Sequence, residues 1–202
     1  KSAEDVRWVD RLLGQLERKY GVRRPIGLEV LIEEVEALIN VEAIAGSSRR
    51  LEALIFGPGD FSASQRIRHS LAGLYPGDPW HYARNRIVVA ARAAGIDAVD
   101  GPYADFRNPE GYRTECIRAS YLGFDGKWAI HPSQIDIANE VFSPTPEEVE
   151  RARRLVAAYE EAQASGLGAV AVDGTMVDAA SVRIARNILT KAELIERLAA
   201  KK

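Results

Sequence analysis

The sequence has 202 residues, of which 47% are hydrophobic and 28% charged, a composition typical of a soluble globular protein. Its formal net charge of −2 provides no attraction for nucleic acid or an anionic membrane. No apolar run approaches the roughly 18 residues of a membrane span, and no signal peptide is visible. The one cysteine, Cys116, excludes an intramolecular disulfide and is typical of a reducing cytoplasm, where we expect the protein.

The first part of the chain alternates predicted helices with short apolar strands. Residues 2–20 have the apolar spacing of an amphipathic helix, which Gly21 ends. A buried strand is predicted at residues 25–32 and a helix at residues 33–44. Leu51–Phe56 is a second predicted strand.

The same alternation continues through the middle of the chain. A helix is predicted at residues 80–94, a strand at 97–99, a helix at Pro109–Leu122 and a last short strand at 127–130. Short strands that alternate with helices indicate βα units and a parallel sheet. The predicted fold class is therefore α/β.

A different pattern follows the last of these strands. Thr145 opens a helix with a capping box. Residues 169–177 have the pattern of a small hairpin, and Asp178 begins a final amphipathic helix. We therefore expect two parts, residues 1–142 and residues 143–202.

A polar residue follows each of the four predicted strands: Glu33, Asp60, Asp100 and His131. This is typical of a (β/α) barrel, whose chemistry gathers at the C-terminal rim, and a doubly wound sheet would give the same pattern. Four units are too few for an eightfold barrel, which needs roughly 200 residues or more. Either this is a half-barrel or a sheet, or the first half is missing, and the start at Lys1 favours a missing half.

Glu33 and Asp60 are candidate metal ligands. Adjacent parallel strands would bring the two carboxylates together, and Mg²⁺ commonly takes two carboxylates from a protein while water and substrate complete its octahedron. The alternative is helix N-capping by Glu33 and turn-capping by Asp60. The glycines of residues 57–59 allow backbone to approach a ligand closely, or form a tight turn without one.

Two more residues suit either a structural or a chemical role. His131 would bind substrate or cap the next helix, and it has no second histidine or cysteine at metal-ligand spacing. Asp178 suits an N-cap of the last helix. Its place on a small appendage after a glycine-rich hinge also permits a mobile lid that delivers a carboxylate.

Five segments together carry a resemblance to known proteins. They are LEVLIEEVEAL, RRLEALIFGPGDFSASQ, GDPWHYARNRIVVAARAAGIDAVDGPYADF, GKWAIHPSQIDIANEVFSP and DGTMVDAAS. With them the chain resembles, from about residue 2 to residue 192, the CoA-ester lyases that include malyl-CoA lyase and the citrate lyase β-subunit-like proteins.

The resemblance implies a (β/α)8 TIM barrel of which residues 1–142 hold about the second half. Residues 143–202 are then a C-terminal helical lid and oligomerisation extension. Asp178 matches the family's lid aspartate, which reaches the active site of a neighbouring subunit, so a homo-oligomer, a trimer or hexamer, is expected. The family's first four βα units have no counterpart here, which predicts a fragment, a processed chain or an incompletely recorded one.

The resemblance also implies the site residues. Glu33 and Asp60 match the family's two Mg²⁺ ligands. Gly59 and Asp60 match backbone contacts to the carboxylate end of the substrate. Ile130 and His131 match a further contact to the substrate or to CoA.

The implied reaction is the Mg²⁺-dependent cleavage of a 3-hydroxyacyl-CoA such as malyl-CoA into acetyl-CoA and a 2-keto acid such as glyoxylate. Asp178 would handle the proton at the carbon of the thioester enolate. Three alternatives stay open: a citryl or citramalyl lyase of the β-subunit type, a 2-keto acid aldolase with a non-CoA substrate, and a fragment that binds CoA esters without catalysis. Glu34 departs from the family, where a small residue is common.

Overall fold

The chain divides into two units in a computed structural model that describes residues 1–74 and 77–200. The first unit is Lys1–Phe142 and the second is Ser143–Lys202. The interpretation of these units as part of a barrel and a lid stays a prediction. Among the described residues, no helix has both the length and the apolar character needed to cross a membrane.

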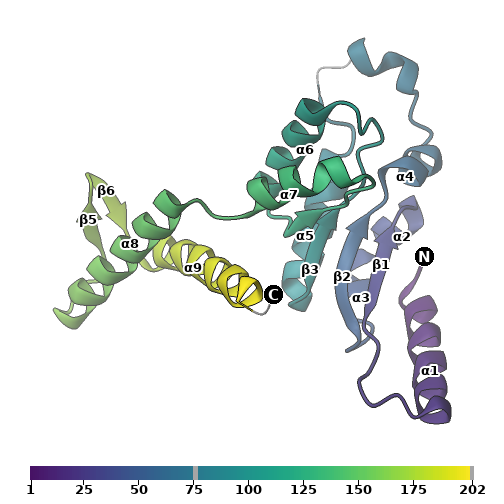
Figure 1. The fold of residues 1–202 in the computed structure, drawn as a ribbon, viewed down its shortest axis with the longest axis horizontal. Coiled ribbons are helices and arrows are strands. Elements are labelled where there is room, and N and C mark those ends of the chain that lie inside the picture. The colour runs from purple at the N-terminus through teal and green to yellow at the C-terminus, as the bar shows by residue number, and fades with distance from the viewer. Residues whose placement is uncertain (75–76, 201–202) are drawn as a thin grey trace. The chain divides into compact units, whose positions relative to one another are not determined.

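The first unit is built from a parallel sheet and its connecting helices (Figure 1). Its elements are α1 (Ala3–Tyr20), β1 (Leu28–Ile32), α2 (Val35–Ile39), α3 (Val41–Ala45), β2 (Leu51–Phe56), α4 (Pro58–Gln65), the 3₁₀ helix η1 (His69–Leu74), α5 (His81–Ala94), β3 (Asp97–Asp100), α6 (Pro109–Leu122), β4 (Gly126–Lys127), the 3₁₀ helix η2 (Pro132–Gln134) and α7 (Ile135–Phe142). The strand order is β1-β2-β3-β4, and every neighbouring pair is parallel. The expected α/β architecture is thus confirmed.

One face of the sheet packs against helices and forms the main core. Helix α5 contacts β2 and β3, and α6 contacts β4. Ile32, Leu54 and Phe56 belong to the core cluster, and Val30 packs against it. Because side chains alternate between the faces of a strand, Glu33, which follows Ile32 in the chain, is directed toward the opposite face.

Three segments differ from the sequence expectations. The helix expected at residues 33–44 is two short helices that meet at Asn40, whose backbone leaves the helical region while its side-chain amide donates to the carbonyl of Lys1. Asparagine is a weak helix former because its side chain competes for backbone groups. The segment 57–59 is no separate turn, since α4 begins at Pro58.

The strand expected at residues 127–130 is also shorter, because β4 ends at Lys127. The Trp128 N–H still donates to the carbonyl of Asp100 at 2.9 Å. β3 ends at Asp100 and is followed by Gly101 and Pro102, and proline has no N–H for a ladder. The chain after Lys127 therefore leaves the sheet.

The second unit consists of two helices and a hairpin. Its elements are α8 (Pro146–Ala164), β5 (Val170–Val172), β6 (Thr175–Val177) and α9 (Ala179–Ala199). The capping box at Thr145 is confirmed, and so is the hairpin, whose turn residues Asp173 and Gly174 have φ of 51° and 74°. Positive φ at both positions is the requirement of a tight two-residue turn. A small separate core contains Tyr159, Val177 and Val182.

The cap of α8 yields a first prediction. Replacing Thr145 by alanine removes the hydroxyl that accepts the N–H of Glu148 at 3.2 Å, so the free energy of unfolding of the second unit should fall by about 1 kcal/mol. Thr145→Asn should preserve it. Chemical denaturation monitored by circular dichroism measures both. Thr190→Ala, inside α9 of the same unit, is the matched control, and an equal loss there would contradict the capping role.

Candidate active site

The carboxyl ends of β1 and β2 lie level with each other. Ile32 pairs with Phe56, and the Gly57 N–H donates to the Ile32 carbonyl at 3.1 Å. Glu33 follows β1 directly, and Asp60 lies in the first turn of α4, which follows β2. Two carboxylates are therefore brought to one end of the sheet by adjacent strands.

Glu33 and Asp60 lie side by side. Their carboxyl groups are within hydrogen-bonding reach, and the pKa of Glu33 is raised above its ordinary value. Burial is the largest cause of that shift, and the negative charges of Asp60 and Glu34 add to it. The pair is held together against its own repulsion, which a cation between the two groups would relieve.

Gly57 makes room for this pair. A Cβ at position 57 would lie 2.5 Å from the Cβ of Glu33 and 2.9 Å from its Oε2. The backbone φ of Gly57 is −102°, a value that any residue adopts. Glycine is needed here because the Glu33 side chain lies where any side chain at position 57 would begin.

Glu34 is engaged elsewhere. Its Oε2 accepts from Ser64 Oγ at 2.8 Å, and Oε1 lies 3.4 Å from Lys1 Nζ. The hydrogen bond from Ser64 is the largest cause that lowers the pKa of Glu34, followed by the charge of Lys1. The hydrogen bond from Ser64 therefore ties Glu34 to α4, and Glu33 is the glutamate beside Asp60.

The donor set suits Mg²⁺. Within residues 1–74 and 77–200, no cluster of three or more His, Cys, Asp or Glu side chains is arranged to hold a metal. Two carboxylates without histidine or thiolate fit a hard cation that keeps several waters and takes further oxygens from a substrate. The site does not match the four-ligand cage of structural zinc. Glu33 and Asp60 as Mg²⁺ ligands stay a prediction that the geometry permits.

The first turn of α4 offers backbone donors next to this pair. Gly57 is the N-cap without a side-chain hydrogen bond, and Pro58 is the first helical residue. The N–H groups of Gly59 and Asp60 follow, and the first N–H groups of a helix have no acceptor within it. Together with the helix dipole they suit a carboxylate ligand. The alternative in which Glu33 caps a helix and Asp60 caps a turn is not found, since Glu34 is the N-cap of α2 and Asp60 lies inside α4.

Ile130 and His131 lie beyond β4, at the other edge of the sheet. His131 Nδ1 accepts the N–H of Ser133 at 3.2 Å and so caps η2, while its ring stacks on Phe106 at 4.6 Å between centroids. The Ile130 N–H donates to Gln134 Oε1 at 2.8 Å. The capping role of His131 is confirmed, and contact of either residue with substrate or CoA stays a prediction.

Asp178 belongs to the second unit, where it is the N-cap of α9. Its Oδ1 accepts from the N–H and the hydroxyl of Ser181 at 2.9 and 3.0 Å. These hydrogen bonds lower the pKa of Asp178, the backbone N–H being the largest cause. The structural role of Asp178 is thereby confirmed, and its catalytic role stays a prediction.

Asp100 ends β3 as expected, but its side chain is buried below the rim, with 0% of the residue exposed. Ala98, two residues earlier, belongs to the helix-packed core, so alternation directs Asp100 to that face as well. Lys127 is its register partner on β4, and Lys127 Nζ donates to Asp100 Oδ2 at 2.7 Å. Arg84 Nε donates to Asp100 Oδ1 at 3.0 Å.

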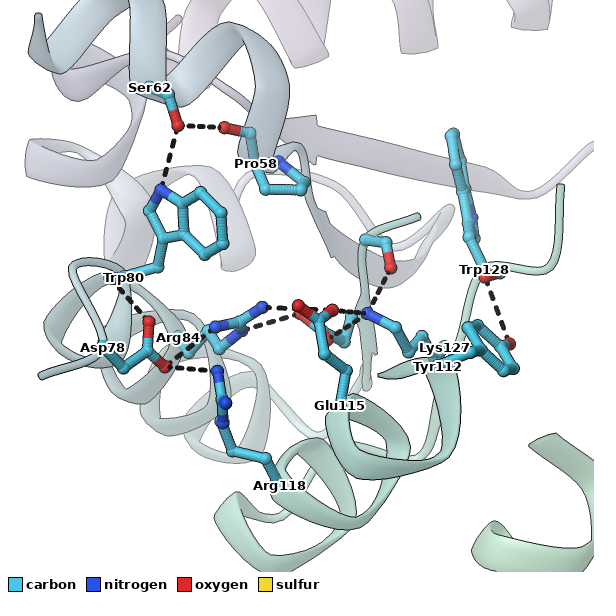
Figure 2. Close-up of polar contacts among 12 residues, drawn as sticks. Pro58, Ser62, Asp78, Trp80, Arg84, Tyr112, Glu115, Arg118, Lys127 and Trp128 are labelled. Atoms are coloured by element: carbon cyan, nitrogen blue, oxygen red, sulfur yellow. Dashed lines mark hydrogen bonds and ion pairs between the residues drawn. The ribbon is translucent and has the colours of Figure 1, made fainter. Parts of the chain in front are cut away.

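These three side chains anchor a buried ion network (Figure 2). Arg84 also donates to Asp78 at 2.9 Å, and Lys127 lies 2.9 Å from Glu115. Burial disfavours the charge of Arg84, but the surrounding carboxylates, Asp100 foremost, outweigh it and raise the pKa. Each buried charge therefore has an opposite partner.

The sequence reasoning missed Arg84 and Glu115. Arg84 does leave a signal, because it stands at helical spacing with Ile87, Val88 and Ala91, all on the buried face of α5. An arginine on an apolar face predicts a buried acidic partner. Nearby, Cys116 is fully buried, and burial raises the pKa of its thiol.

The chain is similar to proteins of a known family. Residues 1–132 match the model of the HpcH/HpaI aldolase/citrate lyase family, and the chain belongs to that family. It is 43% identical over 206 residues to an L-malyl-CoA/β-methylmalyl-CoA lyase of Cereibacter sphaeroides, covering 96% of this chain and 65% of the relative. The family expected from the sequence is confirmed.

Two further relatives bear on function. A (3S)-malyl-CoA thioesterase of Cereibacter sphaeroides is 39% identical over 170 residues, covering 83% of this chain and 57% of the relative. Protein CitE of Mycobacterium tuberculosis, solved with magnesium, acetoacetate and coenzyme A, superposes with a TM-score of 0.70 at 30% identity. That match covers 84% of this chain and 62% of CitE. The chain thus spans less than two thirds of each of these proteins.

The raised pKa of Glu33 yields a second prediction. A carboxyl group with a raised pKa in the fold stabilises the protein below its ordinary pKa, and that stability is lost as pH rises through the raised value. Mg²⁺ would replace the proton, so the increase in melting temperature on adding Mg²⁺ should be larger at pH 7 than at pH 5.

Two glutamate variants test this prediction. Glu33→Gln should abolish the Mg²⁺-dependent shift at both pH values. Glu29→Gln is the matched control, because Glu29 is an exposed residue of the same strand, and it should behave like wild type. A Mg²⁺ shift in Glu33→Gln equal to that of wild type would exclude Glu33 as a ligand.

Proposed function

We propose that the protein containing this chain is a Mg²⁺-dependent lyase that cleaves, or forms, a 3-hydroxyacyl-CoA such as malyl-CoA. The observation that carries the proposal is the pairing of Glu33 and Asp60 at the carboxyl ends of adjacent parallel strands, where burial and the charge of Asp60 raise the pKa of Glu33. The 43% identity to a malyl-CoA lyase supports the substrate class. Magnesium and coenzyme A in the CitE structure support the cofactor and the ligand.

Glu33 and Asp60 would hold the metal, which when bound supplies a Lewis acid for a carbonyl oxygen. Other residues of the chain would orient the substrate beside the metal. The N–H groups of Gly59 and Asp60 at the start of α4 would receive the carboxylate of the 2-keto acid part. Ile130 and His131, at the far edge of the sheet, would contact the rest of the substrate or CoA.

The chemistry at carbon needs one group that exchanges a proton. In cleavage, the 3-hydroxyl gives its proton to water, its oxygen becomes the carbonyl of the 2-keto acid as the C–C bond breaks, and the electron pair of that bond forms a thioester enolate that takes a proton at carbon. Asp178 is proposed for this last exchange. Its lowered pKa keeps it ionised at neutral pH, which suits removal of the proton in the forming direction.

For cleavage, Asp178 must first carry the proton. Covering the carboxylate with protein would raise its pKa by desolvation, which opposes the two hydrogen bonds from Ser181. We therefore propose that the second unit acts as a lid whose closure excludes water and raises the pKa of Asp178. The lid is proposed to serve a neighbouring subunit in a trimer or hexamer.

A hydrolase is the second candidate, because one relative is a malyl-CoA thioesterase. The products separate the two reactions. The full-length protein incubated with malyl-CoA should release glyoxylate and acetyl-CoA if it is a lyase, and malate with free CoA thiol if it is a thioesterase. Citramalyl-CoA and citryl-CoA in parallel test the other lyase substrates.

The Mg²⁺ requirement is the third prediction. We expect glyoxylate release from malyl-CoA with Mg²⁺, and its loss after chelation or in Asp60→Asn. Thiol titration and a keto-acid assay measure the two product sets on the same sample. Turnover that is unchanged by chelation, or free thiol without keto acid, would contradict the proposal. Binding of CoA esters without any turnover would select the non-catalytic alternative.

Asp178 provides the fourth prediction. Asparagine caps helices about as well as aspartate, so Asp178→Asn keeps the cap and removes the proton-transfer group. Cleavage should fall by roughly 10²-fold or more while the fold and Mg²⁺ binding survive. Asp173→Asn, on the exposed turn of the neighbouring hairpin, is the matched control and should leave turnover unchanged.

Subunit mixing then tests whether the lid acts on its neighbour. Asp178→Asn subunits mixed with Glu33→Gln subunits should regain part of the activity, because some mixed interfaces hold one intact site. Near-normal turnover by Asp178→Asn alone would exclude the catalytic role. No recovery in demonstrably mixed oligomers would exclude only the action in trans.

A further inference from the structure

The first turn of α4, which carries Asp60, is held from inside the protein. Ser62 is 2% exposed, and its hydroxyl donates to the carbonyl of Pro58 at 2.6 Å. The same oxygen accepts the indole N–H of Trp80 at 3.0 Å. Figure 2 shows this chain of contacts, which runs from the indole through Ser62 to Pro58. Asp60 lies between Pro58 and Ser62 in sequence, so both ends of its turn are fixed.

No side chain caps α4 at Gly57, so the hydrogen bonds of Ser62 support a turn that has no cap of its own. The Trp80 indole, which donates to Ser62, is itself held in place by neighbouring groups. The guanidinium of Arg84 lies 5.3 Å from the centroid of the Trp80 ring, and the Trp80 N–H of the main chain donates to Asp78 at 2.9 Å. Arg84 in turn is fixed by Asp100 and the rest of the buried ion network.

A second contact reaches the same turn from the loop after β3. Lys127 Nζ donates to the carbonyl of Gly101 at 2.7 Å. A Cβ at position 101 would lie 2.2 Å from the Phe56 carbonyl oxygen and 2.3 Å from Pro58 Cδ. The loop that the network holds is therefore pressed against the first residue of α4, and α4 cannot shift toward it.

We propose that Ser62 and Trp80 are positioning residues for Asp60, and that through them the buried ion network sets the place of one metal ligand. This inference rests on the proposed function, in which Asp60 binds Mg²⁺. A metal ligand placed by rigid outer partners loses less entropy on binding, and such partners commonly change metal affinity 10- to 100-fold. Ser62 and Trp80 touch neither metal nor substrate in this proposal and act only through the helix turn.

The test measures metal affinity directly, in the full-length protein without substrate. Mn²⁺ serves as the probe, because free and bound Mn²⁺ are distinguished by electron paramagnetic resonance. Ser62→Ala removes the hydroxyl, and Trp80→Phe keeps an aromatic ring but removes the N–H. Each should weaken Mn²⁺ binding about tenfold. The double variant should also lose about tenfold and not about a hundredfold, because both substitutions break one shared hydrogen bond.

Two matched controls separate positioning from general stability. Ser47→Ala deletes a hydroxyl that donates to the Ile44 carbonyl at 2.6 Å, before the amino end of β2. Trp8→Phe changes an exposed tryptophan on α1. Both should bind Mn²⁺ like wild type. Melting temperatures are recorded for all variants, so that a loss of fold is distinguished from a loss of affinity.

The outcomes separate this inference from the proposed function. Wild-type affinity in Ser62→Ala and Trp80→Phe, while Asp60→Asn abolishes binding, would overturn the positioning role and leave the metal site intact. An equal loss in Ser47→Ala would overturn it too. Multiplicative losses in the double variant would show that the two residues act independently, against the proposed shared contact. Absence of Mn²⁺ binding by the wild-type protein would overturn the metal site itself, and the inference with it.

Discussion

The carboxylate of Asp100, buried between Arg84 and Lys127, is the interaction on which the first unit depends. A buried charge is tolerated only when it is paired and hydrogen-bonded, and removal of one partner leaves the other uncompensated at a cost of several kcal/mol. Asp100 comes from β3, Lys127 from β4 and Arg84 from α5. Satisfying this one carboxylate therefore fixes a strand register and a helix position at once.

Glu33 and Asp100 illustrate what the sequence could predict and what it could not. Both were expected where strands end, and both are found there. Their surroundings differ because Glu33 is one residue after Ile32 of the core and faces away from it. Asp100 is two residues after the core residue Ala98 and faces the core. To predict whether a strand residue faces the core, one must know which face of the sheet the helices cover. An apolar run such as Leu51–Phe56 does not show which face that is. A shift of one residue along a strand therefore decides whether a carboxylate is a candidate metal ligand or part of the buried ion network.

Local signals were predicted well, since they are complete within a few residues. The capping box at Thr145, the hairpin turn and the cap at Asp178 each depend on contacts between residues up to three apart. The start of α4 at Pro58 was missed, because its supports, Trp80 and Gly101, are distant in sequence. The proximity of Glu33 and Asp60 was inferred correctly from parallel strands, whereas their chemical role is not decided by placement alone.

The burial of Cys116 gives the first unit a built-in chemical reporter. It is the only thiol in the sequence, it is fully buried in α6, and its raised pKa keeps it as the unreactive protonated form. A thiol reagent can modify it only when α6 separates from the sheet, and nothing in the second unit competes for that reagent. The rate of labelling consequently records how often the ion-paired core opens, at equilibrium and in the absence of denaturant.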